Sequence, residues 1–421
     1  MEPKTTIAVP STLRVNGERH WRQLMEIAQI GGTPKGGVCR VTLTEEDRQG
    51  RELFIHWCKE AGCSIEVDQM GNIFARRPGK NNDLPAILIG SHLDSQPTGG
   101  KYDGVYGVLA GLEVIQTLND YHIETEAPIE VVSWTNEEGA RFAPAMIGSG
   151  VYAGAFTLEY AYSRQDKEGI TLKEALESIN FLGEQPVGGR SYAAAFEVHI
   201  EQGPILEAEE KSVGVVTGVQ GIRWYDLTVK GKETHAGPSP MEMRKDPVKG
   251  AIDILQELYA LADEFAPHAR VTIGELKATP GVRNTVPAHV TIAVDLRHPD
   301  TDTLAEMDHK FRDIVQGHVQ RTELEAEVDE IWYSAPVAFD ENCIAAVREA
   351  TKHLGVSAME MVSGAGHDSV YISRVVPTSM IFIPCKDGLS HNELESAKKQ
   401  DVIDGTDVLL HAVLNTAQKL G

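Results

Sequence analysis

The sequence predicts an α/β fold with a second, smaller domain inserted into it. Short apolar runs rich in β-branched residues, at 86–89 and 129–134, predict buried strands. The segment between them, 104–120, is apolar over a broad face and therefore predicts a helix that packs against a sheet. Because strands alternate with helices in this part of the chain, a mostly parallel sheet is the expected core.

The order of elements changes after about residue 219. The predicted elements from there on are a strand, a helix, two strands, a helix and a strand, at 224–229, 247–261, 271–277, 290–296, 303–319 and 324–331. This order, βαββαβ, is the split βαβ arrangement of ferredoxin-like domains. We therefore expect a compact insert in this part of the chain.

The α/β alternation resumes after the insert, with a helix predicted at 341–354, a strand at 380–383 and a last helix at 398–419. The sequence contains no internal repeat and no low-complexity linker. The predicted domains are the first part of the larger domain, the insert, and the second part of the larger domain, at 1–219, 220–332 and 333–421.

Composition and charge exclude several classes of protein. Of the 421 residues, 42% are hydrophobic and 24% are charged, which is typical of a folded globular protein. Lys and Arg total 39 against 62 for Asp and Glu, so the net charge of −23 argues against nucleic acid or an anionic membrane as a partner. The beginning of the sequence has no apolar core of a secretory signal, so we expect a cytoplasmic protein.

The sequence lacks the common nucleotide-binding and nucleophile motifs. There is no GxxxxGK[ST] loop and no GxSxG turn, and Gly364 and Gly366 lack the third glycine of a dinucleotide-binding loop. The five cysteines form no CxxC pair, so neither a disulfide framework nor a thiolate zinc site is expected. The chemistry must therefore come from His, Asp and Glu.

Polar residues able to bind metal follow four of the predicted strands. In chain order these groups are His92 with Asp94, Glu137 with Glu138, His199 with Gln202, and His391. In open α/β sheets, ligands bind outside the carboxyl ends of the strands, so these side chains can meet in one crevice. A single His or Asp at a strand end is more often an ordinary loop residue, and it is the repetition at four strand ends that favours a metal site.

A glycine-rich turn before the helix at 104–120 adds another carboxylate, Asp103. Three imidazoles and two carboxylates suffice for two divalent ions that share one bridging aspartate: His92, His199, His391, Asp103 and Glu138. This mixed nitrogen and oxygen set suits Zn²⁺, Mn²⁺ or Co²⁺. We expect Asp94 to orient the ring of His92 from behind.

The adjacent acids Glu137 and Glu138 are expected to have different roles. A carboxylate that binds metal cannot at the same time transfer a proton, so one of the two ligates and the other can act as a base. A water between two cations has its pKa lowered from near 15.7 toward about 7, and a free carboxylate beside it can take the proton. The pair predicts a hydrolase, and the alternative is an ordinary charged turn.

Four stretches of the chain carry a resemblance to a known family. They are GSHLDSQPTGGKYDGVYGVLAGLEV, WTNEEGARFAPAMIGSGVYAGAF, FEVHIEQGPILE and GVRNTVPAHVTIAVDLRHPD. The chain resembles, from about residue 20 to residue 415, the dizinc amidohydrolases of hydantoinase/carbamoylase type, which hydrolyse N-carbamoyl amino acids. The resemblance implies an aminoacylase or carboxypeptidase-like catalytic domain, and an inserted ferredoxin-like lid domain that also forms the contact of a homodimer.

The resemblance also implies two metal ions per subunit. One is held by His92, Asp103 and His199, and the other by Asp103, Glu138 and His391. Zn²⁺ is the first expectation, with Mn²⁺, Co²⁺ or Ni²⁺ as alternatives. Glu137 becomes the general base, which deprotonates the attacking water and then protonates the leaving nitrogen.

Further contacts to the substrate are implied in the same way. His235 of the lid would stabilise the developing oxyanion, in the neighbouring subunit's site, and Asn284 and Arg297 would bind the substrate carboxylate. Gln202 and His367 resemble additional substrate and metal-site contacts. For Arg297 the alternative is a structural ion pair at a strand end.

The segment Ser95–Thr98 resembles β-ureidopropionases more than allantoate enzymes. We therefore expect hydrolysis of N-carbamoyl-β-alanine, a reaction of pyrimidine degradation, or of N-carbamoyl-L-amino acids, with allantoate amidohydrolase as the nearest alternative. An aminoacylase or dipeptidase is disfavoured because His199 stands where peptidase relatives have an acid. A catalytically inactive metal-binding protein is disfavoured because Glu137 is present.

Overall fold

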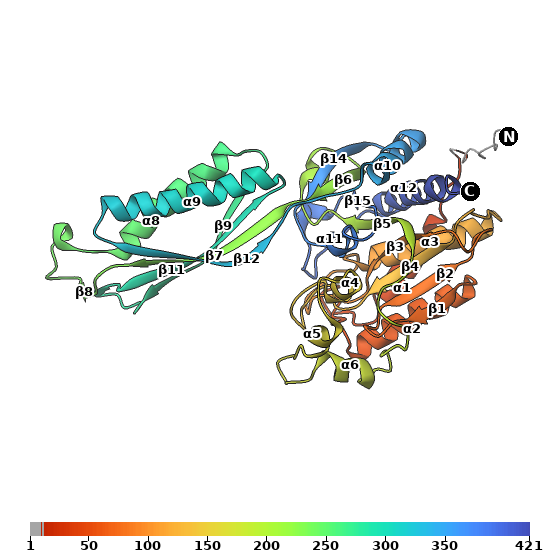
Figure 1. Ribbon diagram of the computed structural model, residues 1–421, viewed down its shortest axis with the longest axis horizontal. Coiled ribbons are helices and arrows are strands. Elements are labelled where there is room, and N and C mark those ends of the chain that lie inside the picture. Colours follow the sequence, from red (N-terminus) through yellow and green to blue (C-terminus); the bar gives the residue numbers. More distant parts are fainter. Residues whose placement is uncertain (1–9, 11) are drawn as a thin grey trace. The chain divides into compact units, whose positions relative to one another are not determined.

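The structure is a computed structural model that describes residues 10 and 12–421 of the chain. The described residues form two units (Figure 1). The larger unit comprises the chain up to Thr217 together with Phe339–Gly421, and the smaller unit comprises Gly218–Ala338. The predicted insert lies within the smaller unit.

The larger unit is built on a nine-stranded sheet with the order β1-β2-β4-β3-β5-β15-β6-β13, in which β14 also pairs with β6; the short strand β13 and the last two residues of β6 belong to the smaller unit. The bounds of these strands are β1 Ser64–Val67, β2 Ile73–Arg77, β3 Ala86–His92, β4 Ile129–Trp134, β5 Tyr192–Ile200, β6 Val213–Val219, β13 Val337–Ala338, β14 Ala358–Ser363 and β15 Thr378–Ile383. The four adjacent strands β4, β3, β5 and β15 run parallel to one another. The strands that flank them, β1, β2, β6 and β13, pair antiparallel.

The prediction of a mostly parallel sheet is therefore wrong, because the sheet is mixed. Only the residues 68–72 join β1 to β2, and a connection this short allows a hairpin but no crossover to a parallel strand. The central strands β3, β4 and β15 are buried along their whole length, as parallel strands covered on both faces are. The edge strand β1 is at most half-buried.

Helices α3, α10 and α12 contact the strands of this sheet (Figure 1). The helices of the larger unit are α1 Gly17–Ile27, α2 Glu45–Glu60, α3 Val105–Asp120, α4 Ile147–Tyr152, α5 Leu158–Tyr162, α6 Leu172–Ser178, α7 Ile205–Ala208, α10 Glu341–Leu354, α11 Ser369–Ile372 and α12 Lys399–Gln418, with a 3₁₀ turn, η2, at Lys386–Gly388. Helix α3 is buried on almost all sides, which explains its nearly uniform apolar sequence. Helix α10 has the bounds that its sequence predicts, because Asp340 caps its first turn and Gly355, with φ of +70°, ends it.

The smaller unit contains a four-stranded antiparallel sheet with the order β12-β7-β11-β9. Its elements are β7 Gly221–Lys230, β8 Thr234–His235, the 3₁₀ turn η1 Met241–Met243, α8 Pro247–Glu264, β9 Arg270–Thr279, β10 Thr285–Val286, β11 His289–His298, α9 Thr301–Arg321 and β12 Glu325–Ser334. Without the short pair β8 and β10, this order is βαββαβ.

Side chains alternate strictly between the two faces of β11. Val290, Ile292, Val294 and Leu296 are buried in one core with residues of α8 and α9. Arg297 and the other odd-numbered residues of β11 lie on the opposite face and are only half-buried. The helices therefore cover one face of this sheet, and polar residues can occupy the other.

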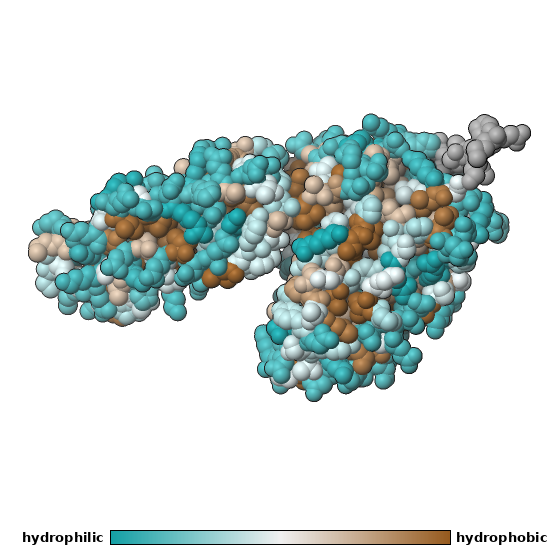
Figure 2. Space-filling model, in the orientation of Figure 1, coloured by the Kyte–Doolittle hydropathy of each residue, from teal (hydrophilic) through white to brown (hydrophobic). Residues whose placement is uncertain are grey.

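Hydrophilic residues dominate the surface of both units in the view of Figure 2. Among the helices that the structure describes, none has the length and apolar character needed to cross a membrane. All five cysteines are free thiols.

Candidate metal centre

The predicted metal-binding residues lie at the carboxyl ends of the four parallel strands. His92 is the last residue of β3, and His199 is the last but one of β5. Glu137 and Glu138 follow β4, and His391 follows β15. Since β4, β3, β5 and β15 are neighbours in the sheet, these residues meet at one edge, as parallel strands of an α/β sheet allow.

Asp103 faces two different sets of side chains with its two carboxylate oxygens. Its Oδ1 lies 3.2 Å from Nε2 of His199 and 3.7 Å from Nε2 of His92. Its Oδ2 lies 3.4 Å from Nε2 of His391, and that nitrogen lies 3.3 Å from Oε2 of Glu138. Asp103 is therefore placed between two groups of potential ligands.

Each of these two groups has three side-chain atoms within 4.8 Å of one another: His92, Asp103 and His199 in the first, and Asp103, Glu138 and His391 in the second. The donor set is imidazole nitrogen and carboxylate oxygen, which suits borderline divalent ions such as Zn²⁺, Mn²⁺ and Co²⁺. The residues present fit two ions that share Asp103.

A third group of potential ligands, Glu197, His199 and His367, overlaps the first. His199 has Nδ1 engaged with the carbonyl of Ile200, so its Nε2 is the nitrogen available to either group. Glu197 accepts hydrogen bonds from the hydroxyls of Ser91 and Ser369. An ion in this third group would compete for His199, so the first two groups form the better pair.

Backbone carbonyls fix the orientation of both buried histidine rings. Nδ1 of His92 lies 2.9 Å from the carbonyl oxygen of Asp94, and Nδ1 of His199 lies 2.9 Å from that of Ile200. Because each ring donates from Nδ1, the lone pair of each Nε2 lies on the side of the ring that faces Asp103, where an ion could be bound. Burial lowers the pKa of His92 to about 4, which favours the neutral imidazole that metals bind.

The carboxylate of Asp94 has a different role from the expected one. It lies 3.7 Å from Nδ1 of His92, beyond hydrogen-bond distance. Instead it accepts hydrogen bonds from the backbone N–H groups of Glu137, at 3.2 Å, and Glu138, at 3.3 Å. Asp94 therefore orients the His92 ring through its carbonyl, and its side chain fixes the loop that carries the two glutamates.

Comparison with known proteins agrees with this arrangement. The profile of peptidase family M20/M25/M40 matches residues 88–415. The chain belongs to this family. Enzymes of the M20 family hydrolyse amides and depend on metal ions.

Several relatives that match over nearly the full length are named amidohydrolases or amidases. The chain is 48% identical over 405 residues to an N-carbamoyl-L-amino-acid amidohydrolase of Rhizobium meliloti, covering 96% of this chain and 97% of the relative. It is 35% identical over 380 residues to an allantoate amidohydrolase of Bacillus subtilis, covering 89% and 92%. The crystal structure of a hydantoinase/carbamoylase family amidase from Burkholderia multivorans has 53% identity and a TM-score of 0.94, covering 96% and 99%.

Glu137 is a buried acid of this M20-family site that belongs to neither ligand group. It is 8% exposed, and its Oε2 lies 3.4 Å from Nε2 of His92. Burial, followed by the negative charges of Asp368 and Glu138, raises the pKa of Glu137 well above its ordinary value. Because Glu137 is a member of neither ligand group, its carboxyl group is left to accept and release a proton during a reaction.

Gln202 and His367 both lie beside the ligands. Nε2 of Gln202 donates to Oδ2 of Asp103 at 3.0 Å and to the hydroxyl of Ser390 at 2.9 Å. The ring of His367 is buried, 4.6 Å from that of His199 between centroids, with Nε2 3.0 Å from the hydroxyl of Ser363.

Sequence reasoning missed two residues that support Asp103. The hydroxyl of Ser390 donates to Oδ2 of Asp103 at 2.8 Å. Oε1 of Glu395 accepts from the backbone N–H groups of Tyr102 and Asp103, at 2.9 and 3.2 Å. Their only sequence signal is their closeness to His391, because neither has the spacing of a ligand.

The remaining predicted site residues belong to the smaller unit. His235 on β8 pairs with Thr285 on β10, and the carbonyl of Asn284 accepts from the N–H of Ala236 at 2.9 Å, so His235 and Asn284 are close. Arg297 lies near the other end of β11, eight residues beyond His289, which corresponds to about 27 Å along the strand. The structure therefore does not bring Arg297 next to His235.

Arg297 pairs with Asp295 on the same strand. Its Nε lies 2.9 Å from Oδ1 of Asp295, and its NH2 group lies 2.8 Å from Oδ2. Nε1 of Trp224 also donates to Oδ2 of Asp295, at 2.8 Å. Arg297 therefore forms a structural ion pair, which is the alternative to a substrate-binding role.

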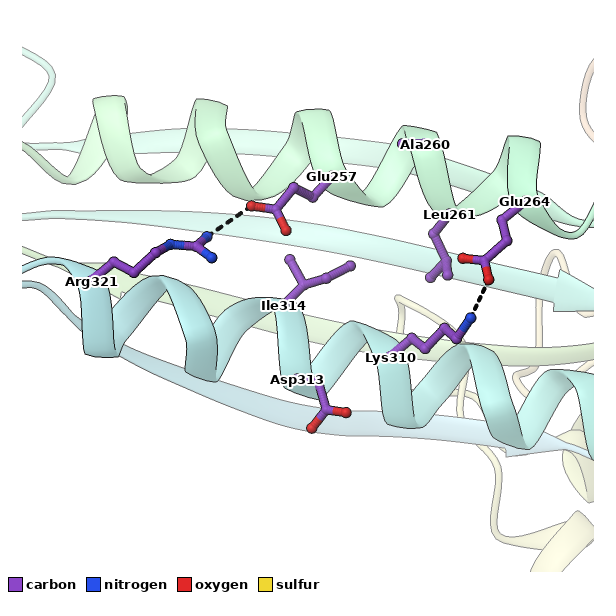
Figure 3. A pocket seen from close by; sticks show the side chains of 8 residues that line it. All are labelled: Glu257, Ala260, Leu261, Glu264, Lys310, Asp313, Ile314 and Arg321. Atoms are coloured by element: carbon purple, nitrogen blue, oxygen red, sulfur yellow. Dashed lines mark hydrogen bonds and ion pairs between the residues drawn. The ribbon is translucent and has the colours of Figure 1, made fainter.

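A surface groove between α8 and α9 has none of these features (Figure 3). Two ion pairs cross it, Arg321 with Glu257 and Lys310 with Glu264, and join the two helices. None of the predicted site residues lines it. This groove is therefore separate from the candidate metal centre.

Proposed function

We propose that the chain hydrolyses the ureido C–N bond of N-carbamoyl-L-amino acids, with N-carbamoyl-β-alanine as a further candidate substrate. The observation that carries the proposal is the placement of Asp103 between two ligand groups with the buried acid Glu137 beside them. The 48% identity to an N-carbamoyl-L-amino-acid amidohydrolase supports this choice of substrate.

Two divalent ions, with Zn²⁺ as the first choice, would be held by His92, Asp103 and His199 and by Asp103, Glu138 and His391. Bound there, they would polarise the ureido carbonyl and lower the pKa of the attacking water.

Glu137 takes one proton from the water and later delivers it to the amino-acid nitrogen, which leaves as the amine. The water adds its oxygen to the ureido carbon as the C–N bond breaks. The product, carbamic acid, decomposes to carbon dioxide and ammonia, so one water is consumed for each substrate. Glu137 is suited to this two-step use because its carboxyl group is buried, belongs to neither ligand group and has its Oε2 3.4 Å from Nε2 of His92.

The smaller unit supplies groups that recognise the substrate. His235 acts on the oxygen that becomes negative in the reaction, and Arg297 binds the substrate carboxylate through its guanidinium. The resemblance implies that Asn284 binds the carboxylate with Arg297, but Asn284 lies beside His235, so it acts on the same oxygen as His235 in this proposal. Gln202 and His367, which belong to the larger unit, also contact the substrate. The roles of Gln202 and His367 rest on the resemblance of the motifs and on the closeness of these residues to the ligand groups. The roles of His235 and Asn284 rest on the resemblance and on their closeness to each other, and that of Arg297 rests on the resemblance alone.

The placing of His235 and Arg297 supports a homodimer through the smaller unit. His235 pairs with Thr285 on β10, just before the start of β11, whereas Arg297 lies about 27 Å along β11 from His289, so we propose that the two residues serve the sites of different subunits. The edge strand β9 and the adjacent helix α8 expose Leu276 (50% exposed), Ile252 (57%) and Tyr259 (51%), which supports an interface there.

The first experiment is a turnover assay with the metal-reconstituted protein on N-carbamoyl-L-amino acids, N-carbamoyl-β-alanine, allantoate and N-acetyl amino acids. We expect the N-carbamoyl-L-amino acids to be the best substrates, with equal release of ammonia and amino acid. The similarity to the allantoate amidohydrolase of Bacillus subtilis makes allantoate the second candidate. Hydrolysis of N-acetyl amino acids alone would reject the proposal.

The dimer is tested by mixing two inactive variants, Glu137→Gln and His235→Ala. If His235 acts in the partner subunit, mixed dimers contain one intact site, and a 1:1 mixture should regain about a quarter of the wild-type activity. If each subunit uses its own His235, the mixture stays inactive. Light scattering of the wild-type protein gives the oligomeric state independently.

A further inference from the structure

Gln96 contacts Glu138 through both its backbone and its side chain. Its backbone N–H donates to Oε1 of Glu138 at 3.1 Å, and its amide Nε2 donates to Oε2 at 2.7 Å. Nε2 also lies 3.4 Å from the carbonyl oxygen of Glu138. Both oxygens of this carboxylate are therefore fixed by one residue.

Gln96 completes a pattern in the segment that follows β3. Every second residue of this segment supports the centre: His92 is a potential ligand, Asp94 accepts from the backbone of Glu138, and Gln96 donates to its carboxylate. The backbone and the side chain of Glu138 are thus held by residues only two positions apart. The sequence alone assigns no role to Gln96, which is part of the segment Ser95–Thr98 that resembles β-ureidopropionases.

The two ligand groups differ in how much their surroundings hold them. The side chains of His92, His199 and Asp103 are almost completely buried, whereas the ring of His391 is 52% exposed. The group that contains His391 therefore has one ligand held only loosely by packing. The geometry of this group therefore depends more on hydrogen bonds to the carboxylate of Glu138. Gln96 donates two of them, one from its backbone N–H and one from its side-chain amide.

We propose that Gln96 is a positioning residue, which holds Glu138 for the ion bound by Asp103, Glu138 and His391 and so sets the affinity of that ion site and not of the other. The inference rests on the proposed role of Glu138 as a ligand. Removal of a residue that orients a ligand typically weakens metal binding by about 10- to 100-fold.

The test is a competition titration of the metal-free, full-length protein with Zn²⁺ and a chromophoric chelator, in the absence of substrate. The variant is Gln96→Met, which keeps the length of the side chain and removes the amide donor. Two reference variants assign the binding steps: His391→Ala removes a ligand of the second group, and His92→Ala removes one of the first. The control is Gln400→Ala, because Gln400 donates to a carboxylate, that of Asp404, at 2.8 Å on the exposed side of α12.

We expect Gln96→Met to weaken, by about 10- to 100-fold, only the binding step that His391→Ala also weakens. Gln400→Ala should bind both ions like the wild type. Unchanged affinities in Gln96→Met, or an equal loss at both steps, would overturn the proposal.

A second variant, Gln96→Asn, guards against loss of folding. It keeps an amide that is one bond shorter, and it should weaken the same step, with thermal unfolding like that of the wild type. The titration uses no substrate, so its result does not depend on whether the protein hydrolyses carbamoyl amino acids. If the wild-type protein bound fewer than two ions, the proposal would be overturned.

Discussion

Gly104 lies directly against the imidazole ring of His92. A Cβ added to Gly104 would come within 2.3 Å of Cε1 and Nε2 of that ring, and the residue has φ of +67°. Two independent reasons, contact and backbone conformation, therefore require glycine at this position. The ring that it contacts presents Nε2 to the proposed ion site.

We predict that Gly104→Ala weakens metal binding because the new methyl group displaces the His92 ring. The positive φ adds a destabilisation of about 1 to 3 kcal/mol in either case. Gly169→Ala is the matched control, since Gly169 has φ of +82° and nothing within 4 Å of an added Cβ. Both variants should lose stability in urea, and only Gly104→Ala should lose metal. Full metal content in Gly104→Ala would contradict the prediction.

Glu137→Gln should keep both ions and lose about 10² to 10⁴ in kcat, because the amide cannot take up the proton. Metal analysis and turnover of the same preparation check the two parts together. The matched variant Glu138→Gln changes the neighbouring acid and should lose metal as well as activity. Undiminished turnover in Glu137→Gln would reject its role as the base.

Arg297→Ala should raise KM for carboxylate substrates by about 10- to 100-fold, the worth of a charge-assisted hydrogen bond of roughly 1.5 to 3 kcal/mol. Arg270 offers a control, because it pairs with Arg297 across β9 and β11 and bonds to backbone carbonyls of 267 and 269. Arg270→Ala should leave KM near the wild-type value. If Arg297→Ala leaves KM unchanged, Arg297 does not bind the substrate and serves only in the ion pair with Asp295.

His20 should make the metal-free protein sensitive to acid. It is fully buried, and neither ring nitrogen has a hydrogen-bond partner among the described residues. Burial, with a smaller contribution from the charge of Arg19, lowers the pKa of His20 from 6.5 to about 3. The folded state therefore resists protonation of His20, so its contribution to stability is complete above pH 6.5 and is lost as pH falls toward 3.

The measurement is urea unfolding at pH 7 and pH 5 in the presence of a chelator. From pH 7 to pH 5 the wild type should lose about 2 kcal/mol more of its free energy of unfolding than His20→Phe does, because only the wild type has His20 to protonate on unfolding. His56→Phe is the control, since His56 is exposed on α2. An equal fall in stability for the wild type and His20→Phe would show that His20 does not titrate in this range.

Four of the five proposed ligands, all except Asp103, could be predicted from the sequence because each lies at or after the end of an apolar run that forms a strand. The pattern shows where a strand ends, and adjacent parallel strands bring His92, His199 and His391 to one edge. The pairing of the outer strands could not be predicted in this way. It depends on contacts far apart in the chain, such as that of β6 with β15.

The supporting residues were missed for a related reason. Gln96, Ser390 and Glu395 act by donating to or accepting from groups near Asp103 and Glu138. Such hydrogen bonds have no characteristic spacing in a sequence, so only the folded chain reveals them. The same holds for Asp94, whose side chain holds a loop rather than the ring two residues before it.

The two ligand groups meet at Asp103, although His92 and His391 are separated by most of the chain, including the whole of the smaller unit. The centre therefore cannot form until the chain has been synthesised as far as His391, which follows the last strand of the larger unit. Ions held there would contact residues from both the first and the last part of the larger unit. Because the site is complete only in the full-length chain, the ions would stabilise the folded full-length protein by mass action.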